Sequence, residues 1–157
     1  MSMTIMSRMC ESIENVTPTR KKEIISATLS SLSTEDRIAM VKLLAMEYDR
    51  NNIGEKKAIK WLANIYNVFE DEIEEEAEKW LYLGEGMLQF LYYDKEHLDM
   101  SLQQMIALLE LDCSSMKSDA YSEIGRNITS MSNLQIKWFI RYWLRTPRNG
   151  INTSMVE

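Results

Sequence analysis

Apolar side chains recur along most of the chain at spacings of three and four residues, the period of an α-helix packed on one side. Alternation of apolar and polar residues, the pattern of a half-buried strand, is never sustained. The pattern predicts an all-α fold, a single compact multi-helix domain of about nine to ten helices. The predicted helices cover approximately residues 2–16, 18–32, 34–48, 55–66, 70–81, 87–93, 102–110, 115–129 and 133–145.

Residues suited to helix N-caps precede several of these ranges. Thr17 followed by Pro18 is typical of an N-cap with proline at the first helical position. Ser132 with Gln135 three residues later has the spacing of a capping box. Ser101 is a further candidate N-cap for the helix that follows it.

Other residues predict where helices stop and which side they bury. The turn at 49–54 (DRNNIG) is rich in residues that tolerate the left-handed region. Gly84 and Gly86 are expected to interrupt the helical pattern, and Pro147 to end the last helix. In the helix at 34–48 the expected buried face consists of Ile38, Val41, Leu44 and Ala45.

Composition agrees with one soluble helical domain. The 157 residues are 45% apolar, with only 5 Gly and 2 Pro, fewer turn residues than an all-β fold needs. No apolar run approaches the ~20 residues of a membrane span, and the N-terminus lacks the unbroken apolar stretch of a signal peptide. Cys10 and Cys113 are predicted to be two buried thiols in a reducing compartment rather than a disulfide.

Charge is segregated along the chain. The net charge of −6 taken alone argues against nucleic-acid binding. Residues 70–78, however, hold an acidic run, whereas residues 137–148 hold only basic charge. The net charge is therefore a poor guide to any single face of the molecule.

The sequence contains no convincing catalytic or metal-binding motif. His97 is the only histidine, and its spacing from neighbouring acids matches no standard metal site, so a solvated loop is favoured. The pair Gly84 and Gly86 follows no strand and is not a phosphate loop. The Lys-x-Asp-Gly pattern that carries a covalent nucleotide in nucleotidyltransferases is absent. We therefore expect no catalytic residues and no metal site in this chain.

Two further clusters permit both a functional and a structural interpretation. The acidic run at 70–78 could be a cation site or a DNA mimic, but a solvated helix that is acidic in its first turn is favoured. Trp138, Tyr142 and Trp143 could stack on bases, but core packing is favoured.

The segment 137–151 reads KWFIRYWLRTPRNGI. It resembles the end of the N-terminal DNA-binding domain of ATP-dependent DNA ligases of the archaeal, eukaryotic and viral type. Thr146 and Pro147 depart from that pattern, because relatives tend to have an acidic residue and a Leu there. The matching residues are Lys137, Trp138, Arg141, Arg145, Arg148, Gly150 and Ile151.

A second match covers residues 51–91. Here, as in the ligase family, a Gly-containing turn leads into a Lys-rich helix, which is followed by an acidic helix and a Leu-Gly turn. The likeness extends over nearly the whole chain and is least specific before Ser33. The residues that fit are Asn52, Gly54, Lys56, Lys57, Ile59, Leu62, Gly84 and Gly86.

The resemblance implies a helical domain that stands ahead of a nucleotidyltransferase domain and an OB-fold domain, both missing here. It implies binding of duplex or nicked DNA across the minor groove, without sequence specificity, during replication or repair. ATP and Mg²⁺ would belong to the missing domains, so no cofactor is expected in this chain. The expected partners are DNA and the ligase catalytic domains, with no membrane. The expected location is intracellular, in the cytoplasm, nucleus or a viral factory.

The residues themselves agree with such a mechanism. A turn that closes on glycine lets backbone N–H groups approach a phosphate closely, and basic groups at helix ends suit backbone contacts. The turns at 52–57 and 145–152 should therefore be neighbours on one surface. We also expect Trp138 to be mostly buried and Arg141 to be partly buried. The predicted DNA-binding residues are Asn52, Gly54, Lys56, Lys57, Arg145, Arg148, Asn149, Gly150 and Asn152.

Two other functions remain open at this point. The chain could be a helical protein–protein interaction module that uses the acidic helix or an aromatic face. It could also be an undetected enzyme, such as a metal-dependent nuclease that uses the acidic clusters. Asn152 or Thr153 suits an N-cap close to the last residue, which indicates a fragment of a longer ligase or a short free tail.

Overall fold

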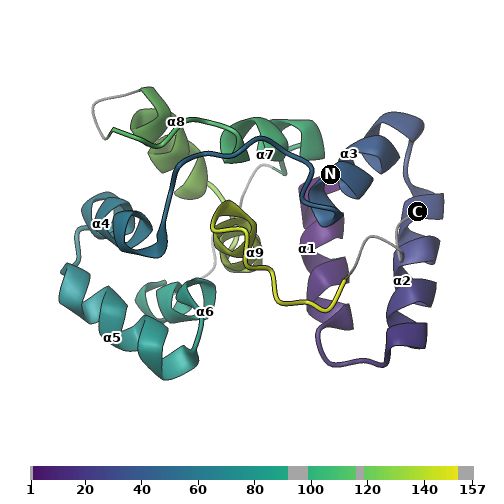
Figure 1. Ribbon diagram of the computed structural model, residues 1–157, viewed down its shortest axis with the longest axis horizontal. Helices are drawn as coiled ribbons and strands as arrows, with labels where there is room; N and C mark the ends of the chain where they lie inside the picture. The colour runs from purple at the N-terminus through teal and green to yellow at the C-terminus, as the bar shows by residue number, and fades with distance from the viewer. Residues whose placement is uncertain (1, 92–98, 116–118, 152–157) are drawn as a thin grey trace.

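A computed structural model describes residues 2–91, 99–115 and 119–151. Within these ranges the chain forms α-helices and one short 3₁₀ helix, η1, and no strand, which confirms the predicted all-α fold (Figure 1). The elements are α1 (Ser2–Ile13), α2 (Pro18–Ser31), α3 (Thr34–Leu44), α4 (Glu55–Tyr66), α5 (Glu70–Trp80), α6 (Leu83–Met87), η1 (Leu88–Phe90), α7 (Leu102–Leu109), α8 (Asp119–Ile128) and α9 (Asn133–Trp143).

The predicted N-caps are present. The Thr17 hydroxyl accepts a hydrogen bond from the backbone N–H of Arg20 at the start of α2. Ser132 and Gln135 form the predicted capping box, in which each side chain accepts from the other residue's backbone N–H. Ser101 caps α7 in the same way. These local signals explain why α2, α7 and α9 begin where the sequence predicts.

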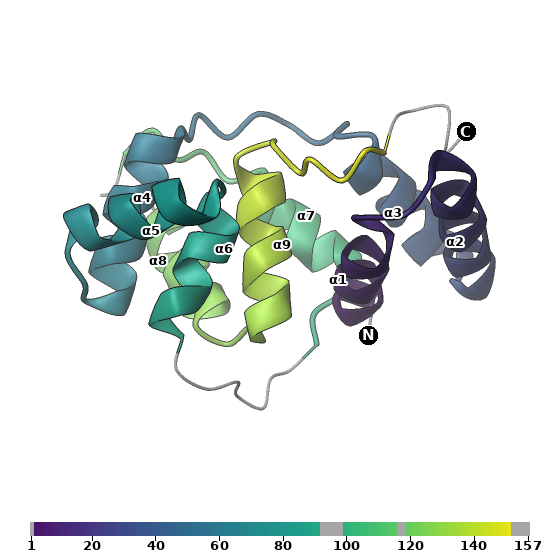
Figure 2. The same cartoon turned by 90° about the horizontal axis from the view of Figure 1, so that it is seen from below.

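Helix α9 lies at the centre of the molecule, with α1 to α3 on one side and α4 to α6 on the other (Figures 1 and 2). It packs against α1, α6 and α7 and is buried on all sides from Gln135 onward. Trp138, Tyr142 and Trp143 have no exposed surface, so core packing is the correct interpretation of these aromatic residues. The predicted burial of Trp138 is confirmed.

Gly84 and Gly86 were predicted to interrupt the helical pattern, but both lie inside α6. A Cβ atom on Gly84 would stand 2.7 Å from the carbonyl oxygen of Lys137 in α9. A Cβ atom on Gly86 would stand 2.7 Å from the backbone nitrogen of Ala77 in α5. Both glycines are therefore required for the close approach of α6 to its neighbours, and the sequence prediction there was wrong.

Two other helices differ from the prediction. Helix α3 ends at Leu44, before the predicted position 48, and Ile38 is 65% exposed. Of the other residues predicted for this face, Leu44 is buried and Val41 and Ala45 are half-buried, and Ala39, Met40 and Leu43 are buried in addition. Helix α9 ends at Trp143, and Arg145 adopts the left-handed region with φ of 58°. Some predictions fall outside the described residues. They concern the loop that contains His97, residues 116–118 of the predicted helix at 115–129, and Asn152 and Thr153.

Both cysteines are free and buried, as predicted. Burial raises the pKa of the Cys10 thiol to about 12 and that of Cys113 to about 11. Among the described residues, no helix has the length and apolar character needed to cross a membrane.

Candidate nucleic-acid interface

Two segments far apart in the sequence lie side by side at the C-terminal end of α9. They are the segment 45–54, which joins α3 to α4, and the segment 144–151, which follows α9 (Figure 2). Asn51 donates from Nδ2 to the carbonyl oxygen of Trp143 at 3.1 Å. Arg145 donates to the carbonyl oxygens of Tyr48 at 3.0 Å and Met46 at 2.8 Å. These contacts bring residues 46–51 beside Arg145 and the end of α9, whereas the placement of the predicted turns 52–57 and 145–152 on one surface stays a prediction.

The Arg145 side chain links the two segments through hydrogen bonds. Besides its two hydrogen bonds to carbonyl oxygens, its guanidinium lies 4.5 Å from the centre of the Tyr48 ring, a cation–π arrangement. The Tyr48 hydroxyl in turn donates to the carbonyl oxygen of Tyr142 at 2.5 Å. Sequence analysis placed Arg145 among the DNA-binding residues. That role remains a prediction, and it would have to use the guanidinium N–H groups of Arg145 that do not bind the carbonyl oxygens of Tyr48 and Met46.

Buried polar side chains form hydrogen bonds that fix the backbone of the segment 144–151. The Arg141 guanidinium donates to the carbonyl oxygen of Pro147 at 2.9 Å. Asn149 is buried, and its Nδ2 donates to the Tyr142 hydroxyl at 2.8 Å while its Oδ1 accepts from the backbone N–H of Ile151. The side chain of Asn149 therefore points inward. This corrects its prediction as a DNA-binding residue, because it shapes the turn instead of facing solvent.

A lysine that sequence analysis missed joins the same turn. Lys21, in the first turn of α2, donates from Nζ to the carbonyl oxygen of Asn149 at 2.9 Å. Gly150 has φ of 70°, and a Cβ atom there would overlap the Lys21 ammonium. One signal was present in the sequence: basic residues at 20–22 occupy a helix start, where the helix dipole disfavours positive charge.

Two of the four basic residues in the run 137–148 are not available to a ligand. Arg141 is 2% exposed and binds the carboxylates of Glu14 at 2.9 Å and Glu85 at 2.5 Å. Lys137 is 9% exposed at its side chain and binds Glu11 at 2.9 Å. Arg141 is more deeply buried than predicted. The basic face that the charge pattern indicated is consequently smaller than the sequence suggests, and Arg148 is its exposed member.

The start of α4 supplies the other half of the surface. Gly54 is the N-cap residue, makes no side-chain cap, and has open space where a Cβ would lie. Asn52 adopts the left-handed region with φ of 60°, as the turn composition predicted. Lys56 is exposed and Lys57 half-buried, and neither makes an ion pair in the part of the chain that is described. The first turn of α4 thus presents unpaired ammonium groups and free backbone N–H groups together.

The Asn52 side chain also anchors this turn to the segment before α8. Its Nδ2 donates to the Asp112 carboxylate at 2.9 Å, and Ser114 donates to the same carboxylate from both its hydroxyl and its backbone N–H. These hydrogen bonds, with that of Asn52 the largest, lower the pKa of Asp112 below its ordinary value. Asp112 therefore stays ionised and keeps the turn fixed.

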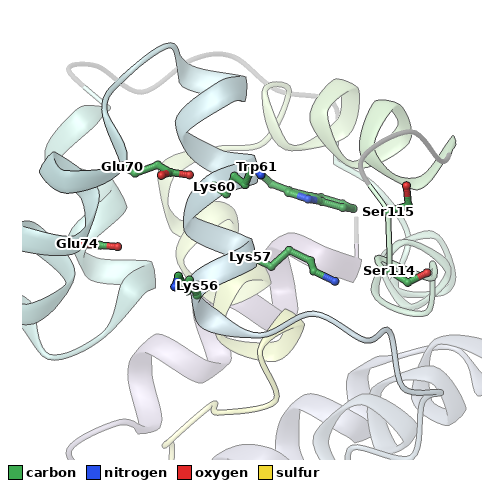
Figure 3. A pocket seen from close by; sticks show the side chains of 8 residues that line it. All are labelled: Lys56, Lys57, Lys60, Trp61, Glu70, Glu74, Ser114 and Ser115. Carbon is green, nitrogen blue, oxygen red and sulfur yellow. The ribbon is translucent and has the colours of Figure 1, made fainter.

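The acidic helix α5 lies next to the lysines of α4. Glu70 and Glu74 line the same pocket as Lys56 and Lys57 (Figure 3). The other acids of α5 surround its buried Ile73 and Ala77, which fits a solvated helix. Among the residues that the structure describes, no group of three or more His, Cys, Asp or Glu side chains is placed to hold a metal ion.

Comparison with known proteins identifies the fold. A family model described as DNA ligase N terminus matches residues 2–157, essentially the whole chain. No curated protein sequence matches the chain significantly.

Proposed function

The chain belongs to the family of DNA ligase N-terminal domains, and from that premise we propose that it grips duplex or nicked DNA through sugar and phosphate contacts. The observation that carries the proposal is the fixed alignment of the segments 45–54 and 144–151 along one edge of the molecule. A duplex laid along this edge would meet the start of α4 and the turn after α9 together.

The proposed contacts are of the kind that suits a phosphate backbone. Lys56, Lys57 and Arg148 supply charge, and the uncapped N–H groups after Gly54 supply hydrogen-bond donors in a region where the helix dipole favours an anion. Gly54 leaves room for the backbone of the nucleic acid to approach closely. No set of side chains at this edge is arranged to read base edges, so we expect little sequence preference.

In this proposal the chain has no chemistry of its own. The N-terminal domain of ATP-dependent DNA ligases is a non-catalytic part of the enzyme. Its partners would be DNA and the ligase catalytic domains, which would bring ATP and Mg²⁺ and seal the nick during replication or repair inside the cell. The chain should therefore bind DNA without sealing or cutting it, and ATP should not adenylate it.

The direct test is the salt dependence of binding to nicked and unnicked duplexes. Each phosphate neutralised adds roughly 0.9 to the slope of log affinity against log salt, so three cationic contacts predict a slope of about −3. With a net charge of −6, the dissociation constant should be about micromolar or weaker at physiological salt. A slope near zero or a strong sequence preference would show that the contacts are not phosphate contacts.

Arg148 offers a sharp variant, because it is exposed and belongs to the segment 144–151 of the proposed edge. Arg148→Ala should weaken binding to every sequence alike and make the slope shallower by about one. Arg126→Ala is the matched control. Arg126 is 72% exposed but lies in α8 close to the N-terminal end of α9, away from the proposed edge. Equal effects of the two substitutions would indicate a general charge effect rather than a defined interface.

A further inference from the structure

A cavity of about 700 Å³ lies between the first turns of α4, the start of α5 and the segment just before α8 (Figure 3). Lys57 and the ring of Trp61 extend from α4 toward Ser114 and Ser115 on its far side (Figure 3). The proposed duplex contacts use only its rim. The residues that line it are Lys56, Lys57, Lys60, Trp61, Glu70, Glu74, Ser114 and Ser115.

Among the described residues, none of the three lysines of the cavity forms an ion pair, although the charge of Lys57 helps to lower the pKa of Asp112. None of their ammonium groups lies within salt-bridge distance of a carboxylate in the part of the chain that is described, whereas Lys137 and Arg141 are each paired with glutamates. Lys57 makes a long hydrogen bond of 3.4 Å to the carbonyl oxygen of Asn52. Like charges gathered on one wall raise the local concentration of anions, so this wall favours a negatively charged ligand.

Trp61 supplies an independent sign that a ligand belongs here. Its side chain is fully buried, and its Nε1 has no hydrogen-bond partner among the residues that the structure describes. The indoles of Trp80 and Trp138 each donate to a glutamate, whereas that of Trp143, which does not line the cavity, resembles Trp61 in having no partner among the described residues. The ring is held in place edge-on to Tyr121 at 5.3 Å. A buried N–H without an acceptor is costly, and a ligand in the cavity could provide the acceptor.

The size of the cavity decides what kind of anion fits. Its volume lies within the range of about 300–1,000 Å³ that small-molecule sites occupy. At ~30 Å³ for each water, a bare phosphate would leave most of it filled with solvent. The Ser114 hydroxyl donates its proton to Asp112 at 3.0 Å, so its oxygen remains an acceptor facing the cavity rim.

We propose that this cavity binds a nucleoside phosphate, with the phosphate held by Lys57 and Lys60 and the nucleoside filling the rest of the cavity, whose wall includes Trp61. The nucleotide is either a free one or an unpaired nucleotide at the end of a bound DNA strand. This goes beyond the grip on duplex phosphates proposed above and does not depend on it, although both use Lys57. Glu70 and Glu74 oppose the lysines and limit the affinity for an anion.

The test is a titration of the full chain with deoxyadenosine 5′-monophosphate, followed through the indole N–H resonance of Trp61 in NMR spectra. Trp61→Phe assigns that resonance. Binding should be saturable and shift it. Lys60→Met should weaken binding about tenfold, as expected for a lost charge-assisted hydrogen bond. Lys22→Met on α2 is the matched control, exposed and on the other side of the molecule, and should have no effect.

A second variant distinguishes an anion site from a cation site by the direction in which it changes the affinity for the nucleotide. Glu74→Gln removes an opposing charge and should tighten binding of the nucleotide a few-fold. Weaker binding by Glu74→Gln, or no saturable shift in the wild-type chain, would overturn the proposal. So would equal affinity for deoxyadenosine, which lacks the phosphate, or for inorganic phosphate, which lacks the nucleoside.

Competition with DNA identifies the source of the nucleotide. If a duplex with a 5′-phosphorylated overhang displaces the mononucleotide, the cavity takes a nucleotide of the bound strand. If both bind together, it takes a free nucleotide, and either result supports the site. Loss of duplex binding with intact mononucleotide binding would overturn only the proposed function. Intact duplex binding without mononucleotide binding would overturn only the cavity proposal.

Discussion

Replacing Arg141 by methionine tests the link between the buried ion cluster and the fold. Arg141 is 2% exposed and binds Glu14 and Glu85, whose side chains are only 23% and 17% exposed. Its guanidinium also lies 4.5 Å from the centre of the Tyr82 ring and 4.7 Å from that of Trp138. Arg141→Met preserves the length of the side chain but leaves two largely buried carboxylates without their main cation.

The expected cost follows from that geometry. Removing one partner of a buried ion pair destabilises a protein by about 3–5 kcal/mol, because the remaining charge stays desolvated. Glu14 retains Lys137 at 3.5 Å and both glutamates keep some contact with solvent, so we expect about 3 kcal/mol, the lower end of that range. Arg141→Lys should recover only part of this loss, since an ammonium cannot bind two carboxylates and a carbonyl in the fork geometry of a guanidinium.

Urea denaturation followed by tryptophan fluorescence measures the change in the free energy of unfolding. Arg126→Met provides the control, because Arg126 pairs with Glu123 at 2.6 Å but is 72% exposed. An exposed pair of this kind contributes less than about 0.5 kcal/mol within a helix. A loss below about 1 kcal/mol for Arg141→Met, or a loss equal to that of the control, would refute the assignment of Arg141 to a structural ion cluster.

Three further predictions concern the core, the thiols and the turn before α8. Trp138→Ala should destabilise the chain by about 3–5 kcal/mol in calorimetry, since a fully buried indole leaves a cavity, and a loss below about 1 kcal/mol would contradict this. Because burial raises their pKa values to about 12 and 11, Cys10 and Cys113 should resist a thiol reagent at pH 8 until the chain is unfolded; rapid labelling of the native chain would contradict this. Asp112 should titrate below its ordinary pKa in NMR spectra, and Asn52→Ala should raise that pKa. The stability that Asp112 contributes is present above its unfolded pKa and is lost as the pH falls through the lower folded pKa. An unchanged pKa of Asp112 in Asn52→Ala would show that Asn52 is not the cause of the shift.

Features decided within a few residues were predictable from the sequence. The N-cap at Thr17 and the capping box at Ser132 and Gln135 depend on hydrogen bonds within one helical turn, and both are present. The bounds of α4 at Glu55 and Tyr66 also agree with the prediction, because a turn precedes that helix and the left-handed Asn67 follows it. Local capping chemistry therefore identified the starts of α2, α7 and α9.

Features decided by packing between distant segments were not predictable. Gly84 and Gly86 are typical of a turn in the sequence, yet they lie in a helix because the backbones of α5 and α9 approach them closely. In the same way, Ile38 is exposed although it belongs to the expected apolar face of α3. Whether a glycine breaks a helix or permits its packing depends on neighbours that the local pattern does not contain.

The candidate interface shows the same division. The family resemblance predicted that the two turns lie together because one duplex must reach both, and the contacts of residues 46–51 with Arg145 and the end of α9 agree with part of this prediction. The participation of Lys21 was not, since its contact with the carbonyl oxygen of Asn149 joins residues 128 positions apart. Nor does a basic residue type reveal whether its charge faces inward: Arg141 and Arg148 belong to one run, but only Arg148 is exposed.

This division of the basic residues has a consequence for the function we propose. The buried cations Lys137 and Arg141 hold α9 to α1 and, through Glu85, to α6, and Arg141 also fixes the backbone at Pro147. Substitutions there should reduce stability and DNA affinity together, but without changing the number of phosphates contacted. Substitution of Arg148 should leave stability unchanged and reduce the salt slope. The salt slope, rather than the affinity alone, therefore separates residues that build the interface from residues that touch DNA.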